Sequence, residues 1–217
     1  IGKILAIGLN YRAHADETGA TLRADPMLFS KAVTSLSGPN DPIMLPRGSE
    51  KTDWEVELAV IIGTKANYVE VDRALDVVAG YAVINDVSER AFQKERGGQF
   101  IKGKSADTFG PLGPWLVTRD EIADPQDLDI WLDLNGERRQ NANTAEMIHT
   151  VAELVSHLSD FMTLMPGDVI ATGTPAGVGL GCKPPRFLKP GDVLECGVES
   201  LGRQRHEVVA FAMAGVG

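Results

Sequence analysis

Two acidic residues, Glu55 and Glu57, lie two positions apart at the start of an apolar run that extends to Ile62. In a β-strand, residues two apart point to the same face, so both carboxylates face one side while Val56 and Leu58 face the other. If they were buried side by side, the carboxylates would repel each other, and one would stay protonated unless a cation neutralised the pair. The alternative is that they form the solvent-exposed face of an amphipathic strand.

A third carboxylate, Asp86, ends a second apolar segment that begins at Tyr81. Three carboxylates without a cysteine or histidine partner suit a hard, octahedral cation such as Mg²⁺ or Mn²⁺. Glu55, Glu57 and Asp86 are therefore candidate metal ligands. Asp86 is equally suited to cap the N-terminus of the helix expected after it, and the two roles can coexist.

His14 and Glu17 lie three residues apart, so on a helical turn they would be neighbours. A glutamate in that position can orient an imidazole and stabilise its charge, which allows the histidine to act as a general base on water. The alternative is an ion pair on the protein surface.

A glycine-rich stretch, Gly173 to Gly181, follows another strand-like segment. It does not fit a phosphate-binding loop, because no Gly-Lys-Ser/Thr follows and Lys183-Pro184-Pro185 cannot open the helix whose N-terminus would hold the phosphate. Two interpretations stay open. One is a tight loop that brings its backbone and Thr174 close to a ligand, and the other is a turn-rich connection.

The elements that must position these residues are mostly strands. Runs of Val, Ile and Leu with Gly, Pro and Asp at their borders predict seven of them: Lys3–Gly8, Glu55–Gly63, Gly80–Asp86, Leu128–Asn135, Asp168–Thr172, Asp192–Val198 and Glu207–Ala212.

Helices are fewer. The clearest covers Thr150–Thr163, where apolar residues recur on one side and Thr150 and Glu153 fit a capping box. Shorter helices are expected at Asp72–Ala79 and Ser88–Arg96. The pattern predicts a mixed, β-rich α+β fold rather than an alternating βαβ chain.

Composition narrows the class of protein. The 217 residues suit a single domain over residues 1–217, the catalytic domain if the candidate residues above act as an enzyme site, and their net charge of −9 disfavours binding to nucleic acid. No run approaches the roughly 18 apolar residues of a membrane span, and no signal peptide is evident. Cys182 and Cys196 form no disulfide framework, which fits a reducing cytoplasm. Because the chain opens with Ile1 inside a strand-like run, we expect a natural N-terminal extension to be missing.

Five motifs share an order and spacing with a known family: Gly8-Leu9-Asn10-Tyr11 with His14 and Glu17, Glu55-Val56-Glu57-Leu58, Asn85 to Arg90 with Gln93, Gly103-Lys104-Ser105 with Asp107-Thr108-Phe109, and Gly173-Thr174-Pro175 with Gly177-Val178-Gly179. From Leu5 to about Val209 the chain resembles the fumarylacetoacetate hydrolase family. The stretch from Glu95 to Phe100, with its two glycines, is most similar to the acylpyruvase-like branch that acts on 2,4-diketo sugar acids.

The resemblance implies a β-roll or β-sandwich-like fold, a homodimer, and one divalent cation, Mg²⁺ or Mn²⁺, in each subunit. Glu55, Glu57 and Asp86 match the three metal-ligand positions of the family. One departure is Ala32, which follows Lys31 where many members have proline, and which would loosen a loop near the pocket.

The resemblance also assigns roles to residues around the metal. Positions that contact substrate match Arg90, Gln93, Lys104 and Thr174, and Lys104 would also stabilise negative charge. His14 and Glu17 match the catalytic dyad, which in acylpyruvase-like members lies on a lid segment that closes over the substrate.

These features together predict a metal-dependent hydrolase that cleaves a carbon–carbon bond in a 2,4-dioxo acid and releases pyruvate. The specific hypothesis is 2,4-diketo-3-deoxy-L-rhamnonate, which would give pyruvate and lactate. The alternatives are a decarboxylase of oxaloacetate-type acids, an isomerase of a homoprotocatechuate-pathway diacid, and a non-catalytic dimeric protein with a relic metal site. The intact His14, Glu17 and Lys104 argue against the last. The expected partner is a small 2-oxo acid, not nucleic acid or a membrane.

Overall fold

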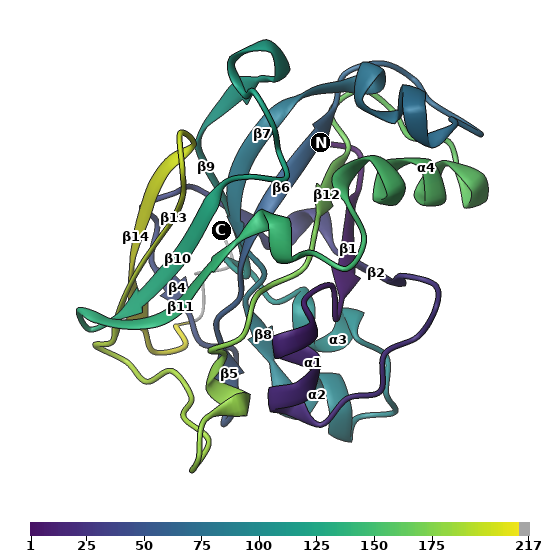
Figure 1. Cartoon of the computed structure of the whole chain (residues 1–217). Coiled ribbons are helices and arrows are strands. Elements are labelled where there is room, and N and C mark those ends of the chain that lie inside the picture. The colour runs from purple at the N-terminus through teal and green to yellow at the C-terminus, as the bar shows by residue number, and fades with distance from the viewer. Residues whose placement is uncertain (213–217) are drawn as a thin grey trace, which may run out of the picture.

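The computed structural model describes residues 1–212 and has the β-rich α+β architecture that the sequence predicts (Figure 1). Its largest sheet has seven strands in the order β2 (Met27–Lys31), β1 (Ile4–Gly8), β12 (Val169–Ala171), β6 (Val56–Ile62), β7 (Val78–Asn85), β9 (Gly110–Thr118) and β3 (Leu36–Ser37). In this sheet β1 and β12 run parallel, whereas β12, β6 and β7 form antiparallel pairs.

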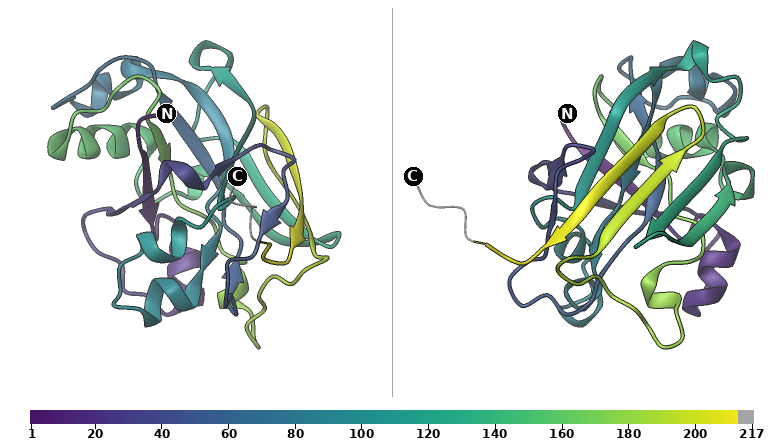
Figure 2. Two further views of the ribbon diagram at one scale, coloured as in Figure 1. Left: turned by 180° about the vertical axis from the view of Figure 1, so that it is seen from behind. Right: turned by 90° about the vertical axis from the view of Figure 1, so that its left-hand side faces the viewer.

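A second sheet has five strands, in the order β11 (Glu137–Asn143), β10 (Asp129–Leu134), β13 (Val193–Val198), β14 (Gly202–Val209) and β4 (Ile43–Met44). It lies across the middle of the seven-stranded sheet, so that β13 and β14 pack on β7 and on its neighbours (Figure 2). A third, two-stranded sheet joins β5 (Thr52–Asp53) to β8 (Ser88–Glu89).

The strand β6 separates two apolar clusters. Val56, Leu58 and Val60 point into the main core between the two large sheets. Ala59 points to the opposite face, into a smaller cluster built on β1, β7 and β12. Because side chains alternate along a strand, Glu55 and Glu57 share the face of Ala59 and lie away from the main core.

Helices gather at the two ends of the sheets. The helices α1 (Arg12–Thr18), α2 (Arg90–Glu95) and α3 (Ile101–Lys104) lie together beyond the C-terminal end of β1, whereas α4 (Val151–Phe161) lies at the other end (Figure 1). Short 3-10 helices occupy Val33–Ser35, Val71–Val77, Arg119–Glu121, Thr144–Glu146 and Gly179–Gly181. No helix within residues 1–212 is both long enough and apolar enough to cross a membrane.

The capping box of α4 is confirmed, since Thr150 Oγ1 accepts a hydrogen bond from the Glu153 N–H and the Glu153 carboxylate accepts one from the Thr150 N–H. Two helix predictions were partly wrong. The segment Asp72–Ala79 forms the 3-10 helix Val71–Val77 instead of an α-helix, and Ser88–Arg96 begins as the strand β8 before α2 starts at Arg90.

Candidate active site

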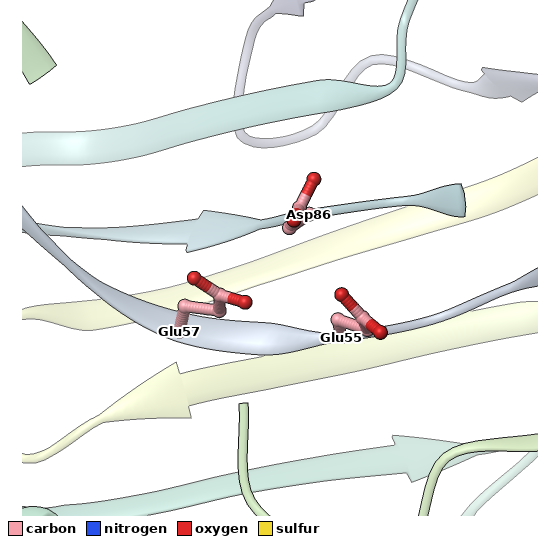
Figure 3. A group of neighbouring side chains, drawn as sticks. All are labelled: Glu55, Glu57 and Asp86. Atoms are coloured by element: carbon pink, nitrogen blue, oxygen red, sulfur yellow. The ribbon is translucent and has the colours of Figure 1, made fainter. Parts of the chain in front are cut away.

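The three carboxylates predicted as metal ligands come together at the junction of β6 and β7 (Figure 3). The backbone N–H of Asp86 donates to the carbonyl of Glu55 at 2.8 Å, which sets Asp86 opposite the start of β6. One oxygen from each of Glu55, Glu57 and Asp86 lies within 4.8 Å of the others. The three residues are at most 4% exposed, so Glu55 and Glu57 do not form a solvent-exposed face. Asp86 also does not cap the following helix, because Glu89 caps α2 with a hydrogen bond from the Ala91 N–H at 3.1 Å.

Two buried lysines neutralise part of this negative charge. Lys104 Nζ lies 2.5 Å from Glu55 Oε2 and 2.6 Å from Asp86 Oδ2, and Lys31 Nζ lies 2.5 Å from Asp86 Oδ1. Burial lowers the pKa of Lys31 below its ordinary value, because Asp86 offsets the desolvation only in part. Burial alone would also lower the pKa of Lys104. The nearby charges of Asp86 and Glu55 outweigh this effect, so the pKa of Lys104 is raised.

Glu57 differs from its two neighbours in what it contacts. Its carboxylate accepts a hydrogen bond from the Gly173 N–H at 2.8 Å, and within residues 1–212 no ammonium or guanidinium group pairs with it. Burial, followed by the charges of Asp86 and Glu55, raises the pKa of Glu57 well above its ordinary value. A buried carboxylate with no cationic partner, beside two other carboxylates, fits a hard divalent cation.

The pKa of Glu55 is shifted in the opposite direction to that of Glu57. Burial alone would raise its pKa, but Arg90 and Lys104 outweigh that effect and hold the pKa of Glu55 well below its ordinary value. Arg90 NH2 donates to Glu55 Oε1 at 2.6 Å. An ionised Glu55 is thus available as a cation ligand at neutral pH.

The predicted dyad lies in the helix α1, on the same side of the sheet as the carboxylates. His14 Nδ1 is 2.8 Å from Glu17 Oε1, and the other carboxylate oxygen of Glu17 accepts a hydrogen bond from the Gly177 N–H at 2.9 Å. Since Glu17 can only accept, it fixes the proton on Nδ1 and leaves Nε2 of His14 with the lone pair that a base needs. His14 is only 6% exposed, which argues against an ion pair on the surface.

A cavity of about 170 Å³ brings most of the predicted site residues together. Seven of them line it: His14, Glu55, Glu57, Arg90, Gln93, Lys104 and Thr174. Glu17 and Asp86 do not line the cavity themselves. Glu17 contacts the lining residue His14, and Asp86 contacts the lining residue Lys104. The Thr174 hydroxyl donates to the carbonyl of Val56 at 2.9 Å and accepts from Gln140 at 2.8 Å, so it has one lone pair left for a ligand.

The rest of the cavity wall is largely apolar, and the sequence interpretation did not include it. Leu9, Met27, Phe29, Phe100 and Leu180 also line the cavity, and Lys104 Nζ lies 5.0 Å from the centroid of the Phe29 ring. Their segments of the chain are far apart, and no periodicity marks them as a group.

Lys31 is a buried residue of the candidate site, paired with Asp86, that the sequence did not predict there. In the sequence it is marked only as the neighbour of Ala32, at the departure from the family pattern. The departure does not loosen the chain, because the Ala32 N–H donates to Ser105 Oγ at 2.9 Å and ties β2 to the end of α3. A proline could not make this bond.

Comparisons with known proteins agree with this geometry. A family model described as the C-terminal domain of fumarylacetoacetate hydrolase matches residues 3–209. This chain belongs to the fumarylacetoacetate hydrolase family. The match confirms the resemblance drawn from the five motifs, and its limits agree with the predicted range from Leu5 to about Val209.

Relatives within the family carry different activities in their names. A protein of Burkholderia cenocepacia (strain HI2424) that is named as a hydrolase, without a substrate, is 60% identical over 94% of this chain and 73% of its own length. The fumarylacetoacetate hydrolase of Exiguobacterium antarcticum superposes with a TM-score of 0.89 at 43% identity, over 96% of this chain and 75% of that one. The 5-carboxymethyl-2-hydroxymuconate delta-isomerase of Mycobacterium smegmatis superposes with a TM-score of 0.86 at 40% identity, over 98% of this chain and 80% of that one.

The short helix that carries the dyad is expected to be loosely held until a ligand binds. α1 has seven residues, too few to be stable alone, and it is polar apart from its alanines. We therefore predict that Arg12–Asp25 exchanges its amide hydrogens quickly in the Mg²⁺-loaded protein and becomes protected when oxalate is added. Hydrogen exchange measured by mass spectrometry checks this. Equal and strong protection of Ala15–Ala20 in both states would mean a preformed site without a lid.

Proposed function

We propose that this protein is a divalent-metal-dependent hydrolase that cleaves a carbon–carbon bond in a 2,4-dioxo acid and releases pyruvate. The observation that carries the proposal is that His14, hydrogen-bonded to Glu17, lines the same cavity as Glu55 and Glu57 of the three-carboxylate cluster. An oriented imidazole can act as a base that activates water, whereas the carboxylates can bind a hard cation. The two features together suit hydrolysis next to an enolate.

The proposed metal ligands are Glu55, Glu57 and Asp86. A bound Mg²⁺ or Mn²⁺ would supply Lewis-acid chemistry and charge stabilisation at the 2-oxo acid end of the substrate.

Side chains of the protein carry out the proton transfers and bind the substrate. His14, held by Glu17, takes a proton from water as the water oxygen attacks the C4 carbonyl. The C3–C4 bond breaks, and its electron pair passes into the enolate of pyruvate, whose negative charge Lys104 stabilises. The proton returns to C3, so the products are pyruvate and the free acid of the acyl group. Arg90 and Gln93 hold the rest of the substrate.

The size and lining of the cavity support a small acyl group. About 170 Å³ is less than the volume of a pocket for a drug-sized ligand. Phe100, from the stretch that resembles enzymes of 2,4-diketo sugar acids, forms part of the wall. We propose 2,4-diketo-3-deoxy-L-rhamnonate as the specific substrate, with lactate as the second product.

A second candidate is isomerisation of an unsaturated dioic acid. It is favoured by solved structures with isomerase names at 39–40% identity. Such a reaction needs the enolate-stabilising groups and a base that moves a proton, but no activated water, so the His14–Glu17 pair would act on a substrate proton instead of on water.

A substrate panel separates these possibilities. With Mg²⁺ present, pyruvate release from short 2,4-diketo acids is expected, with the fastest turnover for the sugar-acid substrate and lactate formed in equal amount. Oxaloacetate and a 2-hydroxy-2,4-diene-1,7-dioate serve as the decarboxylase and isomerase substrates. Turnover confined to either of these would overturn the hydrolase proposal, and no turnover of any substrate would favour a relic site.

A further inference from the structure

One buried carboxylate outside the predicted site, Asp53, connects two of its parts. The residue is 0% exposed and ends β5, two positions before Glu55. Its Oδ2 accepts from Arg90 Nε at 2.9 Å and from the Leu180 N–H at 3.0 Å, while its Oδ1 accepts from the Gly179 N–H at 2.6 Å. Asp53 therefore binds a side chain of α2 and the backbone of the glycine-rich loop at the same time.

On the side of α2, Asp53 fixes the direction of an arginine that lines the cavity. Arg90 is 5% exposed and also contacts Glu55 at 2.6 Å and Gln93 at 3.2 Å. Bonds from both the Nε and the terminal nitrogens hold the planar guanidinium in one orientation. Without Asp53, the Nε atom would lose its acceptor inside the protein.

On the side of the loop, the same carboxylate holds the backbone on which Glu17 rests. The Gly177 N–H donates to Glu17 Oε2 at 2.9 Å, two residues before the N–H that Asp53 accepts. The loop approaches so closely that a Cβ at Gly179 would lie 2.7 Å from Asp53 Oδ1 and 1.9 Å from the Arg186 carbonyl oxygen. These two glycines of the Gly173–Gly181 stretch bring backbone N–H groups to protein carboxylates of the site.

We propose that Asp53 is a positioning residue that couples Arg90, on the substrate side of the cavity, to the loop that supports Glu17 and through it His14. Movement of Arg90 toward a substrate would disturb the Asp53 carboxylate. Release of the loop from Glu17 would disturb the same carboxylate. Substrate binding and correct placement of the base are therefore linked through one group. The kinetic part of this inference rests on the proposed function, whereas the coupling between Arg90 and the loop does not.

The substitution Asp53→Asn tests the coupling, because the amide keeps the size of the side chain but sets an NH₂ group against an N–H donor. We expect KM to rise and kcat to fall, each by about 10- to 100-fold, as Arg90 and Glu17 lose their support together. Asp168→Asn is the matched control. Asp168 is also buried, pairs with Lys3 and lies before β12, away from the cavity. It should lower the melting temperature and leave KM and kcat unchanged.

A second variant perturbs the same contact from the loop. Gly179→Ala forces the loop away from Asp53 but leaves the Asp53–Arg90 pair in place, so kcat should fall by more than KM rises. This variant also decides the question if Asp53→Asn does not fold. Wild-type kcat and KM in folded Gly179→Ala protein would overturn the proposal.

Hydrogen exchange gives a readout that does not depend on catalysis. In the Mg²⁺-loaded wild type, oxalate should increase protection of Gly177–Leu180 and of Arg12–Ala20 together. In Asp53→Asn the two segments should respond separately, or the second should not respond. If both segments respond in the variant as in the wild type, Asp53 has only a structural role.

Discussion

Replacement of Glu57 by glutamine is expected to abolish metal-dependent turnover and leave the protein folded, with unchanged or higher stability in the absence of metal. Burial, Asp86 and Glu55 raise the pKa of the Glu57 carboxyl, and its carboxylate accepts a hydrogen bond from the Gly173 N–H. Glutamine keeps an oxygen for that bond and removes one of the like charges. The measurements are pyruvate release, Mg²⁺ or Mn²⁺ binding by calorimetry, and the melting temperature in EDTA.

The exposed Glu70→Gln serves as the control, because it changes the net charge equally without touching the site. EDTA should inactivate the wild type, and Mg²⁺ or Mn²⁺ should restore it. Full activity of metal-free protein would disprove the metal site.

Asp86→Asn should also abolish turnover, but unlike Glu57→Gln it should lower the stability of the folded protein. Asp86 holds Lys31 and Lys104 at 2.5 and 2.6 Å, and both lysines are buried. Loss of its charge removes the carboxylate that pairs with the buried Lys31, so the folded protein should become less stable.

The substitution His14→Ala should reduce hydrolysis by about 10²–10⁴-fold, the usual contribution of a general base. It should retain part of the ability to exchange the C3 protons of bound pyruvate for deuterium, since the metal and Lys104 would still stabilise the enolate and a buffer base can remove the proton without activated water. Proton NMR of pyruvate in D₂O with Mg²⁺ measures the exchange, and pyruvate release measures hydrolysis.

Asp16→Ala is the matched control for His14→Ala, because Asp16 is exposed on the same helix and lies outside the cavity. Loss of both activities in His14→Ala, with metal binding intact, would move His14 from the role of base to that of a substrate-holding or structural residue.

The sequence predicted most of the charged site because the information was local. The alternation from Glu55 to Leu58 sets both glutamates on one face of β6, and the i,i+3 spacing of His14 and Glu17 becomes a hydrogen bond in α1. The prediction of Asp86 as a site residue depended only on a second strand that ends beside the start of β6. The register of β7, in which Asn85 pairs with Val56, confirms this arrangement.

The missing parts depend on contacts between distant segments. Lys31 and Asp53 carry no local signal, because their roles arise from Asp86, 55 positions away, and from a loop 126 positions away. The strand β9 escaped prediction because Pro111 and Pro114 interrupt it, and prolines argue against a strand interior. The strand β11, with the sequence ERRQNAN, is too polar to show a buried face.

The two lysines beside the carboxylates bear on how the protein would acquire the proposed cation. A site that already contains its own counter-ions can fold before any metal arrives, so cation loading is separate from chain folding. The incoming ion must compete with ammonium groups for the same oxygens, and this competition weakens net affinity. Occupancy by the proposed cation would then follow the concentration of free cation in the surroundings, and the ion would exchange with it. Activity would be set by ionic conditions as well as by substrate supply.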